Sequence, residues 1–151
     1  MTAALAAFAH HALAFLLVAA LLAEMVLLKH ELTVQTARSI LRMDAIYGVC
    51  AGALLIVGAV RVFHTEKGAA YYFSSMPFTI KMVLFLLVGM LSIYPTIQFL
   101  SWRKALTAGG VPTLDAQRAR RMRITIHIEL TLLFVIMLCA ALMARGVGVI
   151  G

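Results

Sequence analysis

The sequence predicts an all-α, polytopic membrane protein folded as a four-helix bundle. Of its 151 residues, 64% are hydrophobic and only 13% are charged, and the mean hydropathy is +1.02. A soluble domain is usually about half apolar and about a quarter charged. In addition, four long apolar runs alternate with polar connections. Lipid permits only helices or closed barrels, and these runs lack the alternation of barrel strands, so each run is expected to be a transmembrane helix.

We expect a single domain over residues 1–151, with spans at about 5–28, 45–63, 78–100 and 124–144. Each run is long enough to cross a hydrocarbon layer about 30 Å thick. The first run lacks the basic start of a signal peptide, so we expect it to be retained. The connection between the second and third spans has room for a short interfacial segment with Tyr71, Tyr72 and Phe73. The last connection is expected to break at Gly109–Gly110 and Pro112.

The basic residues predict the orientation of the chain. The net charge of +7 lies mainly between the apolar runs, where it orients the spans and does not indicate nucleic-acid binding. One side carries nine of these residues: Lys29, Arg38, Arg42, Arg103, Lys104, Arg118, Arg120, Arg121 and Arg123. The other side carries Arg61, Lys67 and Arg145, with Lys81 just inside the third span. The first side is expected to be cytoplasmic, which places both termini on the periplasmic side of a bacterial inner membrane.

Five polar residues from three spans are expected at similar depth near the periplasmic surface, and we call them the outer belt: His10, His11, Arg61, His64 and Lys81. Imidazole binds haem iron, and cations pair with porphyrin propionates. The alternative is that these side chains simply lie at the membrane interface. On the haem interpretation His10 is the best axial metal ligand, and the second ligand is His64, His11 or a methionine such as Met76, Met82 or Met90.

A second polar set, the inner belt, is expected in the cytoplasmic half: Glu24, His30, Arg42, Asp44, Gln98, Trp102, Arg103, His127 and Glu129. Glu24 and Glu129 fall within the hydrocarbon, where an ionisable group is costly and usually finds a partner in the bundle interior. They are candidates for a proton path that includes His127. Alternatively, they form ion pairs with Arg42, Arg103 or Arg123.

Helical periodicity predicts which side chains share a face. Glu24 follows His10 by nearly four full turns, so both belong to one inward stripe with Ala14, Leu17 and Leu21. His11 points about 100° away from His10. In the second span, Gly48 and Gly52 form a GxxxG pattern, which favours close helix packing, a flat ligand against the backbone, or self-association.

Several motifs are absent, and their absence narrows the function. There is no GxSxG, HExxH, Walker loop or dinucleotide fingerprint, which disfavours hydrolases and nucleotide-driven proteins. Cys50 and Cys139 lie in apolar runs without CxxC spacing and are expected to be buried free thiols. These absences leave one further interpretation, a helix bundle that carries a cofactor in its core.

The order of residues resembles that of the small four-span HemJ-type protoporphyrinogen oxidases. The similar elements are His10 opening the first span, Arg38 and Arg42 before the second, FTIKMVLFLL with Lys81, SWRK with Trp102 and Arg103, and IELTLLF with Glu129. The chain departs from this family in its third span, where LSIYPTIQFL lacks a late histidine, and in its first span, where Glu24 stands near the usual proline. The resemblance implies haem b and the oxidation of protoporphyrinogen IX to protoporphyrin IX.

The sequence therefore predicts a haem- or porphyrin-binding redox protein, with Glu24, Glu129 or His127 moving protons and a membrane quinone or another haem protein accepting electrons. A second redox version is a cytochrome with two haems, one held by His10 or His11 with His64 and the other by His30 with His127. The alternative from another class is a small transport or assembly subunit that uses Glu24 and Glu129 to bind an ion or a partner helix.

Overall fold

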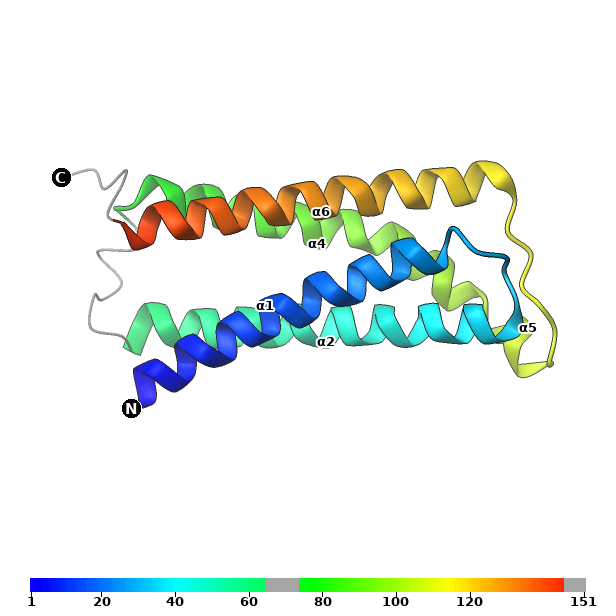
Figure 1. The fold of residues 1–151 in the computed structure, drawn as a ribbon, viewed down its shortest axis with the longest axis horizontal. Coiled ribbons are helices and arrows are strands. Elements are labelled where there is room, and N and C mark those ends of the chain that lie inside the picture. The colour runs from blue at the N-terminus through cyan, green and yellow to red at the C-terminus, as the bar shows by residue number, and fades with distance from the viewer. Residues whose placement is uncertain (65–73, 146–151) are drawn as a thin grey trace.

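The computed structural model describes residues 1–64 and 74–145, apart from the side chain of His64. Its elements are α1 (Thr2–Leu27), α2 (Val34–His64), α4 (Met76–Ser101), α5 (Arg103–Thr107) and α6 (Ala116–Ala144). The four long helices are each apolar and long enough to cross a membrane. They lie side by side along the long axis of the molecule, and α1 begins at the end where α6 finishes (Figure 1). The predicted all-α, four-span fold is confirmed.

Short polar signals fix where the helices begin and end. The Thr33 hydroxyl accepts a hydrogen bond of 3.1 Å from the Thr36 backbone N–H at the start of α2. The Asp115 carboxylate caps α6 in the same way, 2.8 Å from the Arg118 N–H. Between α5 and α6 the chain turns at Gly109, whose φ of 76° suits a residue without a Cβ atom. The predicted break at Gly109–Gly110 is confirmed.

Two helices are longer than the apolar runs within them. α2 begins at Val34, although the apolar run begins near residue 45, and α6 begins at Ala116, although its apolar run begins near residue 124. Arg38 and Arg42 are therefore helical, where the sequence suggested a connection. Hydropathy marks the part of a helix inside the hydrocarbon, whereas caps and helix-forming residues such as Ala, Arg and Gln carry the helix beyond it.

The long helices associate as two pairs. α1 packs mainly against α2, and α4 packs mainly against α6, while contacts between the pairs are sparser (Figure 1). We call the space between the α1–α2 pair and the α4–α6 pair the seam. Buried apolar side chains from both pairs fill its centre, among them Leu17, Leu21, Ile40, Val88 and Phe99.

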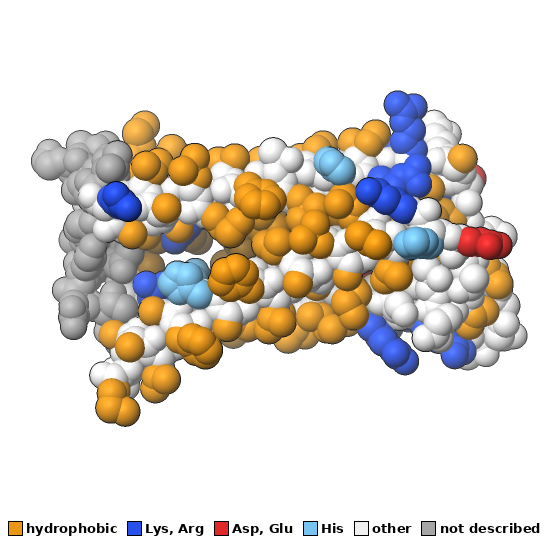
Figure 2. Space-filling view, viewed as in Figure 1, with side chains coloured by type: hydrophobic (Ala, Val, Ile, Leu, Met, Phe, Trp, Pro, Cys, Tyr) orange, Lys and Arg blue, Asp and Glu red, His pale blue; other side chains and the backbone are white. Residues whose placement is uncertain are grey.

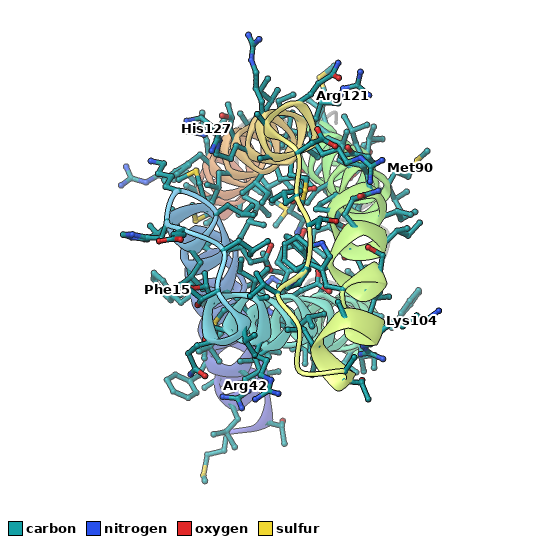
Figure 3. The ribbon with its side chains drawn as sticks, turned by 90° about the vertical axis from the view of Figure 1, so that its right-hand side faces the viewer. Phe15, Arg42, Met90, Lys104, Arg121 and His127 are labelled. Carbon is teal, nitrogen blue, oxygen red and sulfur yellow. The ribbon has the colours of Figure 1, made fainter. Side chains whose placement is uncertain are left out.

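The outward faces of the helices are apolar, as a lipid environment requires. Phe15 and Met90 are 73% and 70% exposed, and both point away from the bundle (Figure 3). Apolar side chains cover the middle of the face shown in Figure 2, while lysines and arginines gather toward the ends. The chain thus exposes hydrocarbon where a soluble protein would expose charge.

The GxxxG pattern does not pack helices within this chain. Gly48 and Gly52 are exposed, and a Cβ atom added at either would meet none of the described residues within 4 Å. The expectation of close packing inside the bundle is wrong, because these glycines lie on the side of α2 that faces away from its neighbours. Their part in self-association stays a prediction.

Candidate functional site

A cavity of about 580 Å³ lies at the end of the bundle where α1 begins, and all four long helices line it. This is within the range of about 300–1,000 Å³ that is usual for small-molecule sites. Its polar lining residues include His10 from α1, Arg61 from α2 and Lys81 from α4. The surface is hollowed between α1 and α6 at this end (Figure 2). The structure thus brings together three of the five outer-belt residues.

His10 faces this cavity from the third turn of α1. Its imidazole lies beside Gly58 of α2, where an added Cβ atom would be 3.7 Å from His10 Cε1. Its Nδ1 atom is buried and has no hydrogen-bond partner among the described residues. A histidine nitrogen in this state is available to a ligand or a metal ion.

His11 provides the contrast. It is exposed, and its Nδ1 donates a hydrogen bond of 2.6 Å to the Ala7 carbonyl one turn earlier in α1. It does not line the cavity. The expected divergence of the two neighbouring imidazoles is therefore confirmed, and it favours His10 over His11 as the functional histidine.

Arg61 and Lys81 give the cavity a positive charge. They lie close enough to each other and to His10 to interact electrostatically. The ammonium group of Lys81 also lies 5.0 Å from the centre of the Phe78 ring, a cation–π contact that holds it at the cavity wall. Among the described residues that line the cavity there is no carboxylate. The arrangement suits a ligand with an apolar body and an anionic edge.

The remaining outer-belt candidates are placed differently. The side chain of His64 lies outside the described residues. Of the methionines considered as a second ligand, Met82 lines the cavity. Met76 and Met90 are 59% and 70% exposed and do not line it. Tyr71, Tyr72 and Phe73, expected in an interfacial segment, also lie outside the described residues.

Sequence reasoning missed several cavity residues. Gly58 supplies the open wall beside His10, and the apolar walls include Phe63, Phe78, Phe85, Met137 and Met143. For α2 a signal existed, since Gly58, Arg61 and Val62 follow the three- and four-residue spacing of one helical face. For α6 the sequence gives no signal of which face lines the cavity, because apolar residues surround this helix on all sides.

Three carboxyl groups are buried in the seam at the other end of the cavity. Glu129 of α6 is 0% exposed, Glu24 of α1 is 2% exposed and Asp44 of α2 is 8% exposed. They lie close enough to interact electrostatically. The hydroxyl of Thr96 in α4 donates a hydrogen bond of 2.6 Å to Asp44. The sequence expected these residues at one depth, and the structure brings them together.

The ion pairs that the sequence offered for these carboxylates do not form. Both oxygens of Glu129 and the Oε1 atom of Glu24 lack a hydrogen-bond partner within residues 1–64 and 74–145. Within the same residues, the ion pair that forms is on the surface, where Arg118 Nε lies 2.9 Å from Asp115 Oδ2. Expected pairing with Arg42, Arg103 or Arg123 is therefore wrong. Arg42 and Arg103 are exposed, and the half-buried Arg123 donates to the Leu28 carbonyl, while the carboxyl groups are buried in the seam.

The two carboxylates of the expected proton path lie one to two turns from the cavity. Leu133 lines the cavity, and Glu129 follows one turn away along α6, an axial rise of about 6 Å. Val18 lines the cavity, and Glu24 follows less than two turns along α1. Buried Leu21 and Leu130 lie along these stretches. The inward stripe from His10 to Glu24 is thereby confirmed.

His127 and His30 do not join this group. His127 is exposed on α6 and lines a separate surface groove, to which His30 does not contribute. His127 points outward from the bundle (Figure 3). No set of three or more His, Cys, Asp or Glu side chains in the described parts of the chain is arranged to hold a metal ion. The structure therefore gives the two-haem version no shared site for His30 and His127.

Comparison with known proteins supplies the class of the chain. A family model described as "Predicted membrane protein (DUF2214)" matches residues 2–148. Neither the curated proteins nor the solved structures contain a match.

Proposed function

The chain belongs to the DUF2214 family of membrane proteins, and from this premise we propose that it binds haem b or a related porphyrin in the cavity lined by His10, Arg61 and Lys81. The observation that carries the proposal is the buried, unpartnered Nδ1 of His10 in an apolar cavity that also holds two cations. A porphyrin has an apolar ring and anionic propionates, so it matches both features.

Each residue has a distinct part in this proposal. His10 would bind the iron, and Met82 or His64 would be the candidate for a second ligand. Arg61 and Lys81 pair with the propionates. Phe85 and Leu133 exclude water from the ring. When bound, haem supplies one-electron redox chemistry. The resemblance to HemJ-type proteins suggests protoporphyrinogen IX as the substrate.

A substrate oxidation of this kind releases protons and electrons together. Glu129 and Glu24 lie within two turns of the cavity, and as buried carboxyl groups they can accept and pass on protons. A membrane quinone or a second haem protein is the proposed electron acceptor. His127 has no place in this path as we propose it, because it lies on the surface of α6.

The test is an absorption spectrum of the purified protein in detergent, oxidised and then reduced, with titration of added haem. We expect a Soret band and reduced α and β bands of a b-type haem. His10→Ala should lose about tenfold or more in haem affinity, whereas His11→Ala, its exposed neighbour, should keep wild-type affinity. Lys81→Gln should weaken binding, with Lys104→Gln on the surface as its control.

A featureless spectrum after haem addition would overturn the proposal. So would equal haem affinity in the His10→Ala and His11→Ala variants. If haem binds, protoporphyrinogen oxidation with a quinone acceptor can be measured in the same preparation, and no oxidation would restrict the proposal to haem binding.

A second candidate function is proton-linked transport, and the uncompensated burial of Glu24 and Glu129 favours it. A colourless protein that moves protons or a solute in liposomes would support this function. Glu24→Gln or Glu129→Gln should then abolish transport and leave the fold intact. Normal transport in both variants would exclude it.

A further inference from the structure

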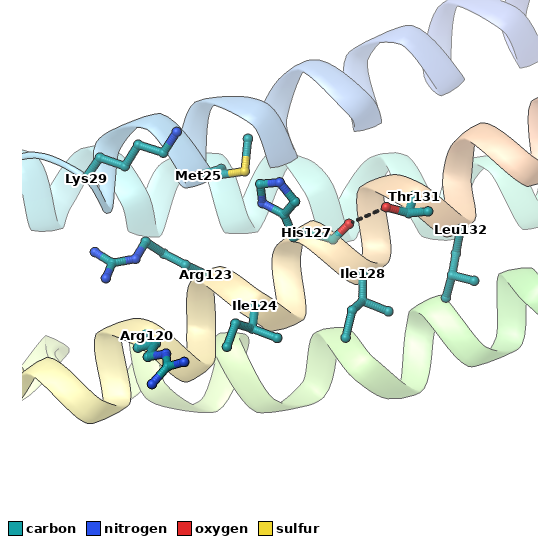
Figure 4. A pocket seen from close by; sticks show the side chains of 9 residues that line it. All are labelled: Met25, Lys29, Arg120, Arg123, Ile124, His127, Ile128, Thr131 and Leu132. Carbon is teal, nitrogen blue, oxygen red and sulfur yellow. Dashed lines mark hydrogen bonds between the residues drawn. The ribbon is translucent and has the colours of Figure 1, made fainter.

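A second concave site lies on the outside of the bundle, at the end opposite the cavity. It is a groove of about 560 Å³ between α1 and α6. Figure 4 shows Lys29 and Met25 on the α1 side, with His127 of α6 next to Met25, and Ile124, Ile128 and Leu132 farther from α1 along α6. It shares no lining residue with the cavity of His10. The proposed function above does not use it.

One end of the groove is strongly positive. Lys29, Arg120 and Arg123 line it, and no carboxylate is among the described residues of the groove. None of the three forms an ion pair within the part of the chain that the structure describes. Arg123 donates a long hydrogen bond of 3.5 Å from its guanidinium group to the Leu28 carbonyl. Lys29, in the turn after α1, and two arginines of α6 therefore line the same groove, and the described lining residues supply no anion. A cluster of cations without an anion suits a phosphate group.

The rest of the groove is apolar. Along α6, Ile124, Ile128 and Leu132 follow Arg120 at intervals of four residues, so they form one stripe on the same face. The stripe runs about 18 Å from Arg120 to Leu132 at the helical rise per residue. In Figure 4 the cations lie at one end and Leu132 at the other. The groove thus passes from the charged membrane surface into the hydrocarbon.

We propose that this groove binds one anionic phospholipid. Its head-group phosphate contacts Lys29, Arg120 and Arg123, and an acyl chain lies along Ile124, Ile128 and Leu132. Charge complementarity selects an anion, and the apolar stripe selects an anion that carries a hydrocarbon chain. A free phosphate ion would leave the stripe empty, and a zwitterionic lipid would place its own cation beside the three of the groove.

The test is native mass spectrometry of the full-length protein, released from detergent after incubation with phosphatidylglycerol or with phosphatidylcholine. We expect one retained phosphatidylglycerol and about tenfold less phosphatidylcholine. Arg120→Gln/Arg123→Gln should lower phosphatidylglycerol retention about tenfold. Lys104→Gln/Arg121→Gln is the matched control, because it removes the same charge from exposed positions outside the groove.

Three outcomes would overturn the proposal. They are equal retention of the two lipids, equal loss in the groove and control variants, and displacement of phosphatidylglycerol by millimolar inorganic phosphate. A further variant, Ile128→Trp, fills the apolar stripe without changing charge and should also lower retention. All the substituted positions are exposed except Arg123, which is half-buried, so circular dichroism should show an unchanged fold.

Discussion

Thr96 donates a hydrogen bond of 2.6 Å to Asp44 and so joins α4 to α2 across the seam between the two helix pairs. Contacts between the pairs are sparse, and lipid supplies no hydrophobic driving force for helix association. A polar contact between the pairs is therefore one of the interactions that determine how they dock.

Thr96→Val should lower the free energy of unfolding by about 0.5–2 kcal/mol, because it keeps the shape of the side chain and leaves Asp44 without its donor. The measurement is unfolding in mixed micelles with increasing SDS. Thr131→Val is the control, since that hydroxyl bonds only to the His127 carbonyl of its own helix. Equal effects of the two variants would show that the link across the seam adds nothing.

Glu129→Leu should raise the stability, by about 1–3 kcal/mol, which is the opposite of the usual effect of changing a buried residue. Both carboxyl oxygens of Glu129 are buried without hydrogen-bond partners among the described residues. The substitution therefore removes the free-energy cost of burying a polar group and breaks no hydrogen bond. Leu133→Ala, one turn away and also buried, should lose about 2–4 kcal/mol. A destabilised Glu129→Leu protein would mean that the carboxyl group has a partner in the membrane.

Gly58→Leu should abolish haem uptake, because a side chain there enters the space beside His10. Gly58→Ala should be tolerated, since its Cβ atom would make an ordinary contact at 3.7 Å. Gly48→Leu, on the exposed face of α2, is the control for placing leucine at a helical glycine. Haem titration of the three variants checks the prediction, and full uptake by Gly58→Leu would place the ligand elsewhere.

The orientation can be checked with single cysteines after Cys50 and Cys139 are replaced by alanine. Cysteine at Thr2 should react with a membrane-impermeant maleimide in intact spheroplasts. Cysteine at Glu31 or Thr113 should react only after the membrane is opened, because the basic side is expected to be cytoplasmic. Reaction of Glu31→Cys in intact spheroplasts would reverse the predicted topology.

The sequence predicts the four spans, because apolar length is a strong signal in membrane proteins. It also predicts the inward stripe from His10 to Glu24 and the grouping of His10 with Arg61 and Lys81, because helical periodicity and depth can both be read from residue numbers. It does not predict which helices pair, since every span is apolar around its circumference. The Thr96–Asp44 bond, the place of Gly58 at the cavity and the outward position of His127 all depend on that pairing.

Pairing also bears on how the chain is assembled. Each pair consists of consecutive spans, so α1–α2 and α4–α6 can each enter the bilayer as a hairpin before the two meet. Until then, Glu24 and Glu129 belong to separate hairpins, and at their depth each faces lipid. Docking is the step that moves both from lipid into the seam, so Glu129 meets Glu24 and Asp44 only at the final stage of biogenesis, after insertion is complete.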